Sequence, residues 1–163
     1  ADLSGANLHC ANLHRADLSG ADLSGAYLHD ANLHRANLYG ANLYDANLHR
    51  ANLYGAYLHD ANLHRADLSG ANLHCANLHR ADLTGAYLSG DSIIDGGCDP
   101  RGYRFVAIQQ AAGYRVAAGC RWYTPAEADE HWTADGTPGR VEIRAKLAMF
   151  EATAVARGWM GSV

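Results

Sequence analysis

Histidine is the side chain best suited to chemistry in this sequence, because nine of its ten copies share one position of a five-residue pattern. These nine are His9, His14, His29, His34, His49, His59, His64, His74 and His79. Stacked imidazoles could bind a metal ion or respond to pH near about 6. Histidines twenty residues apart would, however, form flat ladders that do not converge tetrahedrally, and Cys10 beside His9 does not change this. We therefore expect no metal site and no cofactor.

A catalytic centre is also not expected. His131, outside the pattern, has no nearby serine or cysteine nucleophile motif, and Cys98 and Cys120 lack close metal-ligand spacing to it. No glycine-rich phosphate loop follows a strand pattern. Cys10 and Cys75 are expected to be free thiols, whereas a disulfide involving Cys98 or Cys120 is left open. The prediction is a protein without catalytic residues; the alternative is an enzyme seated in residues 96–163.

The histidines belong to eighteen uninterrupted pentads that fill residues 1–90. Alanine is always first and leucine always third, whereas the other three positions vary. A step of five makes no stripe along a helix and alternates faces along a strand, so neither element can bury the leucines. A chain that turns by about a right angle every pentad can point both positions inward. Four pentads would then close one square coil of twenty residues.

This A(D/N)LXX pattern resembles the pentapeptide-repeat family, whose members fold as right-handed quadrilateral β-helices. The resemblance implies an all-β solenoid over residues 1–95, with about 4.75 coils and with alanine and leucine facing inward. Residues 91–95 are interpreted as a nineteenth, degenerate pentad in which Ile93 takes the leucine position.

The charges agree with a twenty-residue coil. Three pentads end in aspartate, and an arginine stands twenty residues after each of them. The predicted stacked ion pairs are Asp30 with Arg50, Asp45 with Arg65, and Asp60 with Arg80. Because the coils stack about 4.8 Å apart, each acid should lie against its arginine. Gene duplication could produce the same spacing.

One column departs from this pairing because it stacks two like charges beside aromatic rings. This candidate contact strip consists of His14, Arg15, His34, Arg35, Tyr54 and His74. We expect it to be the contact surface of the solenoid, and the alternative is a solvated wall.

Residues 96–163 are predicted to form a small α+β domain of ββαα type for capping and interaction. Two strands, over residues 103–110 and 114–124, flank a turn. Thr124, Pro125 and Glu127 are typical of a capped helix start, and a second amphipathic helix covers residues 141–159. The segment resembles a small module attached to phage- and prophage-encoded proteins.

A β-helix end exposes unpaired backbone groups and leucines that something must cover. We expect residues 96–163 to cover the C-terminal end. The first pentads begin without a visible cap, and native sequence could precede them. The candidate assembly edge is Ala1, Leu3, Ala6 and Leu8.

The functional hypothesis is a non-enzymatic structural or assembly protein, a phage or prophage virion component such as a spike, fibre or decoration element. Its partners would be further copies of itself or virion proteins, in the virion or the cytoplasm. We expect no membrane partner, because no signal peptide or membrane span is visible.

The alternative is a binding module that acts on a DNA enzyme such as gyrase by DNA mimicry. Residues 1–90 carry eight aspartates and five arginines, a net charge of −3. A rod of about 23 Å that mimicked DNA would need on the order of thirteen negative charges. The net charge of −4 over the whole chain likewise gives no reason to expect nucleic acid as a partner.

Overall fold

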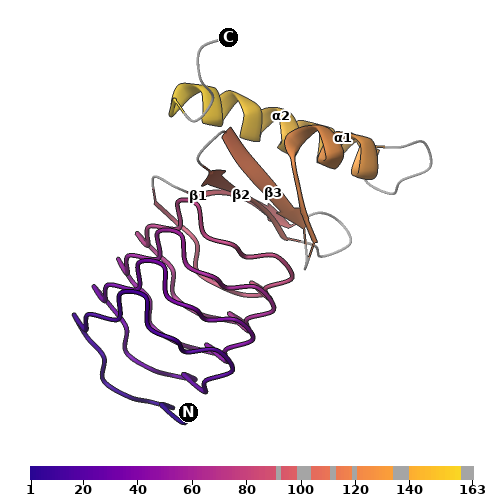
Figure 1. Cartoon of the computed structure of the whole chain (residues 1–163). Coiled ribbons are helices and arrows are strands. Elements are labelled where there is room, and N and C mark those ends of the chain that lie inside the picture. Colours follow the sequence, from indigo (N-terminus) through magenta and orange to yellow (C-terminus); the bar gives the residue numbers. More distant parts are fainter. Residues whose placement is uncertain (91–92, 99–103, 111–112, 119–120, 134–139, 159–163) are drawn as a thin grey trace.

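The structure is a computed structural model of the chain, and it describes residues 1–90, 93–98, 104–110, 113–118, 121–133 and 140–158. Residues 1–90 wind into a stack of coils, with a small α/β unit seated on the last coil (Figure 1). The second residue of each pentad forms an isolated parallel bridge to the residue twenty positions later, from Asp2 with Asp22 to Asp67 with Tyr87. The predicted coil of twenty residues, four pentads to a turn, is thereby confirmed.

Each corner of the coil is closed by local hydrogen bonds. The side-chain oxygen of the second residue accepts from the backbone N–H of the fourth, as in Asn47 and His49 (3.0 Å). The next alanine then donates to the preceding leucine carbonyl, as in Ala51 to Leu48 (3.0 Å). The fifth residue of every pentad through Gly85 adopts a left-handed conformation, with φ between 54° and 69°. The hydrogen bond accepted by the second side chain explains why that position is so often aspartate or asparagine.

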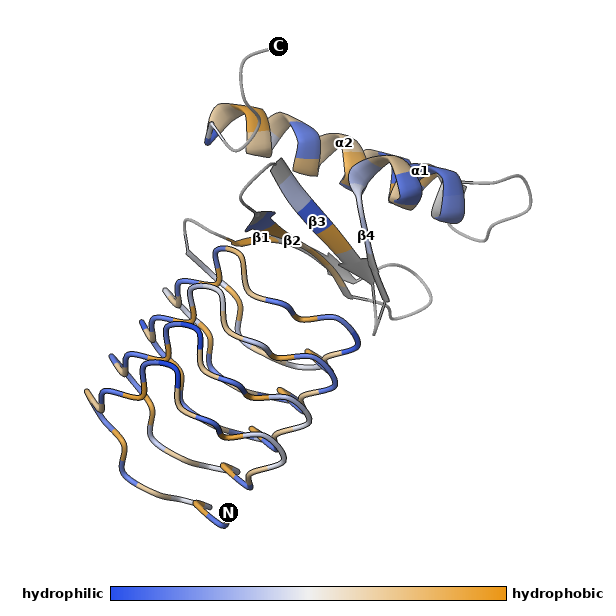
Figure 2. Cartoon of the chain, viewed as in Figure 1, coloured by the Kyte–Doolittle hydropathy of each residue, from blue (hydrophilic) through white to orange (hydrophobic). Residues whose placement is uncertain are grey.

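The solenoid core is a column of alternating alanine and leucine. Every such residue from Ala21 to Leu88 is at most 7% exposed, and Figure 2 shows hydrophobic and hydrophilic residues alternating along each coil. Outside this core, asparagine side chains form ladders between coils: Asn52 donates to Asn32 (3.4 Å) and Asn72 donates to Asn52 (3.3 Å). The stack is therefore held from within by apolar burial and from outside by repeated hydrogen bonds.

Four strands and two helices follow the coils. They are β1 (Ile93–Cys98), β2 (Arg104–Gln110), β3 (Gly113–Ala118), β4 (Arg121–Tyr123), α1 (Pro125–Thr133) and α2 (Arg140–Ala156). The strands form one antiparallel sheet in the order β1-β2-β3-β4. Both helices lie on the face of this sheet that points away from the solenoid (Figure 1).

The sheet closes the solenoid because its side chains alternate between two buried faces. Ile93, Val106 and Ile108 join the leucine core of the coils. Ile94 and Phe105 point the other way and pack with apolar residues of the helices. The sheet thus covers the C-terminal end of the leucine core, as predicted.

Two sequence predictions for this unit need correction. The sheet has four strands rather than two, because residues 114–124 divide into β3 and β4 and because β1 was not predicted. Residues 93–95 form the start of β1, antiparallel to β2, instead of a nineteenth pentad. The apolar residue at position 93 suits both a pentad and a strand, and pairing with β2 determines that it forms a strand. Ile93 is still buried in the leucine core, as expected. β1 runs across the boundary expected between residues 95 and 96.

The predicted helix start is confirmed. The Glu127 N–H donates to Thr124 Oγ1 (3.3 Å), and the Thr124 N–H donates to Glu127 Oε2 (2.7 Å). The second helix begins at Arg140 and ends at Ala156; the end predicted for it, residue 159, lies outside the described residues. Among the described segments, neither helix is long and apolar enough to cross a membrane.

Candidate binding surface on the solenoid

The candidate contact strip forms a continuous column of rings on one wall of the solenoid. The ring centroids of His14 and His34 lie 4.9 Å apart, and those of His34 and Tyr54 lie 5.2 Å apart. Tyr54 stacks on His74, again at 5.2 Å. The sequence therefore placed these residues correctly relative to one another, while their role in contact stays a prediction.

A groove of about 620 Å³ runs along the corner beside this column. Its lining residues are Arg15, Arg35, Tyr54, Gly55, Tyr57, Cys75 and Asn77. Gly55 occupies the position directly after Arg35 in the stack, and a Cβ there would lie 3.4 Å from Arg35 Cγ. The missing side chain at this corner therefore leaves the Arg35 stem uncovered.

The groove differs electrostatically from the other corners. Arg50, Arg65 and Arg80 place Nε 3.4, 2.9 and 3.1 Å from the Oδ1 atoms of Asp30, Asp45 and Asp60, respectively. All three predicted ion pairs are thus present. Within the segments that the structure describes, neither Arg15 nor Arg35 has a carboxylate at ion-pair distance. Two guanidinium groups are therefore left without counter-charge on one face.

His34 lies in this strip between His14 and Tyr54. Its partial burial, together with His14, Arg35 and Arg15, lowers the pKa of the imidazole below its usual value. Its Nε2 atom is buried without a hydrogen-bond partner. Protonation of His34 is therefore disfavoured, first by burial and then by the neighbouring positive charges.

Four lining residues of the groove were not predicted as site residues: Gly55, Tyr57, Cys75 and Asn77. Tyr57 stands at the second position of the neighbouring pentad and is 55% exposed. The sequence does hold a signal for Gly55 and Tyr57. Glycine at the fifth position of a pentad removes a side chain from the corner column, and Tyr57, two residues later, lines the space that this leaves.

A second hollow, of about 480 Å³, lies where the last coil meets the sheet. His59, Cys75, His79 and Arg115 are among its lining residues, and the rings of His59 and His79 stack with centroids 5.0 Å apart. This hollow depends on where β3 places Arg115, and no pattern in the sequence indicates that position.

The candidate assembly edge lies in the first coil. Its leucines and those of the next two pentads pack against the core but are only partly buried, unlike the leucines of later coils. Assembly through this edge stays a prediction. Cys10 and Cys75 are free thiols; Cys120 and the side chain of Cys98 lie outside what the structure describes.

Two solved structures similar to this chain are of pentapeptide repeat proteins. A pentapeptide repeat protein, Rfr23, from the cyanobacterium Cyanothece 51142 is 43% identical over 54% of this chain and 59% of its own, with a TM-score of 0.33. HetL, involved in heterocyst differentiation regulation in Nostoc sp. strain PCC 7120, is 36% identical over 55% of this chain and 56% of its own (TM-score 0.26). The chain therefore spans less than two thirds of either protein. QnrB1, a plasmid-mediated fluoroquinolone resistance protein, is 24% identical over 62% and 55% (TM-score 0.38).

No curated protein sequence matches the chain significantly. The family model for pentapeptide repeats matches eight copies, over residues 1–25, 11–50 and 51–90. These matches cover more than half of the chain and coincide with the stacked coils. The chain therefore belongs to the pentapeptide-repeat family.

Proposed function

We propose that this chain is a non-catalytic binding scaffold whose solenoid holds an acidic segment of a partner protein. The observation that carries the proposal is the contrast between paired and unpaired arginines. Arg50, Arg65 and Arg80 each lie against an aspartate, whereas Arg15 and Arg35 face a groove with no described acidic residue in its lining. A partner carboxylate would supply the counter-charge that the chain does not provide there.

The rest of the groove suits a peptide. Tyr54 and Tyr57 offer aromatic surface beside the guanidinium groups, and arginine and tyrosine are enriched where proteins bind one another. The backbone ladder fixes the spacing of these side chains before a partner arrives. A preorganised surface loses less conformational entropy on binding, which favours recognition by a rigid solenoid.

The narrower hypothesis of a phage or prophage virion component is a special case of this proposal. It rests on the resemblance of residues 96–163 alone, and a virion partner would have to supply an acidic segment that fits the groove. Self-association through the candidate assembly edge is a separate prediction.

DNA mimicry toward gyrase fits the charges less well. Three of the eight aspartates in residues 1–90 are paired with arginine. The negative charge left unpaired is far below that of duplex DNA of similar length. No described feature of the surface favours this alternative over binding of an acidic segment.

A fluorescein-labelled peptide of alternating glutamate and tyrosine tests the proposal by fluorescence anisotropy at low ionic strength. We expect the Arg15→Ala/Arg35→Ala variant to bind about tenfold more weakly. The matched control is Arg50→Ala/Arg65→Ala, which removes the same charge from paired sites and should change affinity by less than about twofold. Equal losses in both variants would show that the peptide senses only net charge, and the proposal would then be wrong.

A further inference from the structure

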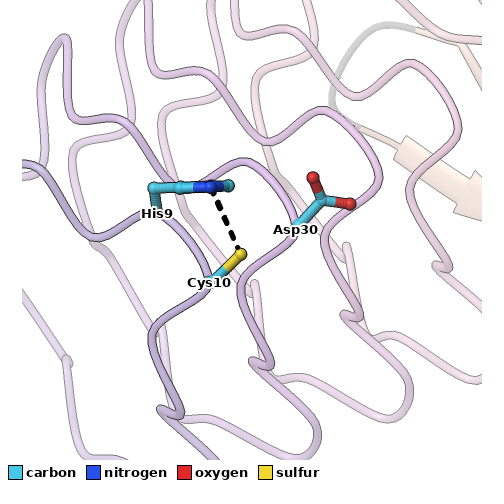
Figure 3. Close-up of side chains that lie close together, drawn as sticks. All are labelled: His9, Cys10 and Asp30. Carbon is cyan, nitrogen blue, oxygen red and sulfur yellow. Dashed lines mark hydrogen bonds between the residues drawn. The ribbon is translucent and has the colours of Figure 1, made fainter.

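A second site lies on another corner of the solenoid, where two adjacent coils bring three different metal-ligand side chains together. One ligand atom each of His9, Cys10 and Asp30 lies within 4.8 Å of the other two. Figure 3 shows the three side chains gathered on the outside of this corner. His9 and Cys10 end one pentad, and Asp30 takes the position of Cys10 in the next coil.

The backbone holds these residues in register. The Cys10 N–H donates to the His29 carbonyl at 3.1 Å, and the bridge between Asn7 and Tyr27 joins the same two pentads. Cys10 and Asp30 both adopt left-handed φ values, 56° and 57°. Because both corners have the same conformation, their side chains leave the backbone in the same direction. The proximity of thiol and carboxylate is thus a property of the coil.

A hydrogen bond determines which nitrogen of His9 is free to bind a metal ion. Its Nδ1 lies 3.0 Å from the His29 carbonyl oxygen. A carbonyl can only accept, so Nδ1 carries the proton and Nε2 keeps its lone pair. Cys10 Sγ lies beside the ring, 3.4 Å from Nε2 and 3.5 Å from Nδ1, and the ring stacks on His29 with centroids 3.8 Å apart. A hydrogen bond from the second ring nitrogen to a carbonyl is typical of metal-binding histidines.

The carboxylate of Asp30 is held in a similar way. Arg50 Nε lies 3.4 Å from Asp30 Oδ1, so the guanidinium neighbours one oxygen of the carboxylate. Ligating carboxylates commonly have such an outer partner. Among the described residues, the other oxygen, Oδ2, has no ion-pair partner and is available to a metal ion.

The donor set selects the kind of ion. Imidazole nitrogen, thiolate sulfur and carboxylate oxygen together suit Zn²⁺ and similar late divalent metals, whereas Mg²⁺ and Ca²⁺ prefer oxygen alone. Tetrahedral ligands of Zn²⁺ lie about 3.3–3.6 Å apart. The ligand atoms lie within 4.8 Å of one another and their residues are exposed, so rotation about side-chain bonds is the movement that binding requires.

We propose that His9 Nε2, Cys10 Sγ and Asp30 Oδ2 bind Zn²⁺ with one position open to water or to a ligand from a partner. Binding converts the Cys10 thiol to a thiolate and releases its proton to solvent. Histidines along their own columns form flat ladders, whereas at this corner the next coil stacks the carboxylate of Asp30 onto Cys10.

Cobalt titration of the tag-free, reduced full chain tests this site, because Co²⁺ replaces Zn²⁺ and absorbs light. We expect one bound Co²⁺ with tetrahedral absorption and a sulfur-to-cobalt charge-transfer band, both lost when Zn²⁺ is added. Cys10→Ser should abolish the charge-transfer band, and Asp30→Asn should weaken cobalt binding about tenfold or more.

Two matched variants serve as controls. Cys75→Ser changes the cysteine of an identical ANLHC pentad, and Asp45→Asn removes an aspartate that is also paired with an arginine. Both should retain the absorption spectrum. Absence of the charge-transfer band from the unmodified chain, or its survival in Cys10→Ser, would overturn the proposal. Circular dichroism of each variant checks that the coils remain folded.

Discussion

Arg65 lies directly against Asp45 in the stack, with Nε 2.9 Å from Oδ1, although twenty residues separate them in the chain. The same guanidinium group reaches Tyr44, donating from Nη1 to the phenol oxygen at 3.4 Å. One turn of the square coil therefore places residues as neighbours that are remote in sequence. The surface of this protein is organised in columns, and its properties follow from what each column contains.

The Asp45–Arg65 pair should contribute little to stability. Its side chains are 38% and 58% exposed, so solvent and salt screen their attraction. We expect a double-mutant cycle with Asp45→Asn and Arg65→Gln to give a coupling of about 0–1 kcal/mol in the free energy of unfolding. Urea denaturation measures it, and a coupling of several kcal/mol would contradict the surface character of the pair.

Burial of leucine should dominate the stability of the coils. Leu48 is fully buried, so Leu48→Ala is expected to lower the free energy of unfolding by about 2–5 kcal/mol. Leu3→Ala is the matched control, because Leu3 is only partly buried and should lose clearly less. Equal losses in urea denaturation would mean that depth in the stack does not determine the contribution of a leucine.

Glycine at a corner should matter more where a neighbour is close. Gly25 and Gly70 both have left-handed φ, 63° and 69°, so alanine costs about 1–2 kcal/mol at either site. A Cβ at Gly25 meets nothing within 4 Å, whereas one at Gly70 lies 3.2 Å from Arg50 Cγ. Gly70→Ala should therefore destabilise the chain more than Gly25→Ala. Thermal unfolding of the two variants compares them, and the reverse order would contradict this geometry.

His34 should make stability depend on pH. Burial and the positive charges of His14, Arg35 and Arg15 lower the pKa of its imidazole in the folded state. In the window below about pH 6.5 the unfolded chain then binds more protons than the folded chain. Stability is therefore lost as pH falls from the unfolded pKa through the folded one, and it is retained above this window.

NMR titration of the histidine ring protons checks this expectation. Arg35→Gln should raise the pKa of His34 because it removes one of the three nearby positive charges. Arg80→Gln, on a different column, is the control and should leave the His34 pKa unchanged. No response to Arg35→Gln would show that charge on the strip does not reach this imidazole.

Much of the fold could be predicted because the repeat constrains it so strongly. Alanine and leucine every five residues exclude a helix and a strand, and the aspartate–arginine spacing indicates a coil of twenty. The helix cap formed by Thr124 and Glu127 could also be predicted, because its hydrogen bonds join residues close in sequence. Strand β1 could not be predicted from local sequence, because Ile93 also fits a leucine position of the repeat. Only its antiparallel pairing with β2 distinguishes a strand from a further pentad.

The surface sites were harder to predict than the core. The groove beside Arg35 exists because Gly55 has no side chain to fill it. A search of the sequence for functional groups does not select glycine. The proximity of Cys10 to Asp30 depends on comparing different residue types within one column. Once the coil length is known, comparing all residues twenty positions apart, whatever their type, would have indicated both features.

The most direct measurement of the proposed function is an NMR titration of the isotope-labelled 17.5 kDa chain with the glutamate–tyrosine peptide. We expect the side-chain signals of Arg15 and Arg35 and the backbone signals around Tyr54 to shift together, while those of the paired Arg50 and Arg65 stay unchanged. Shifts confined to other corners, or spread evenly over all five arginines of the coils, would contradict binding of an acidic segment at this groove.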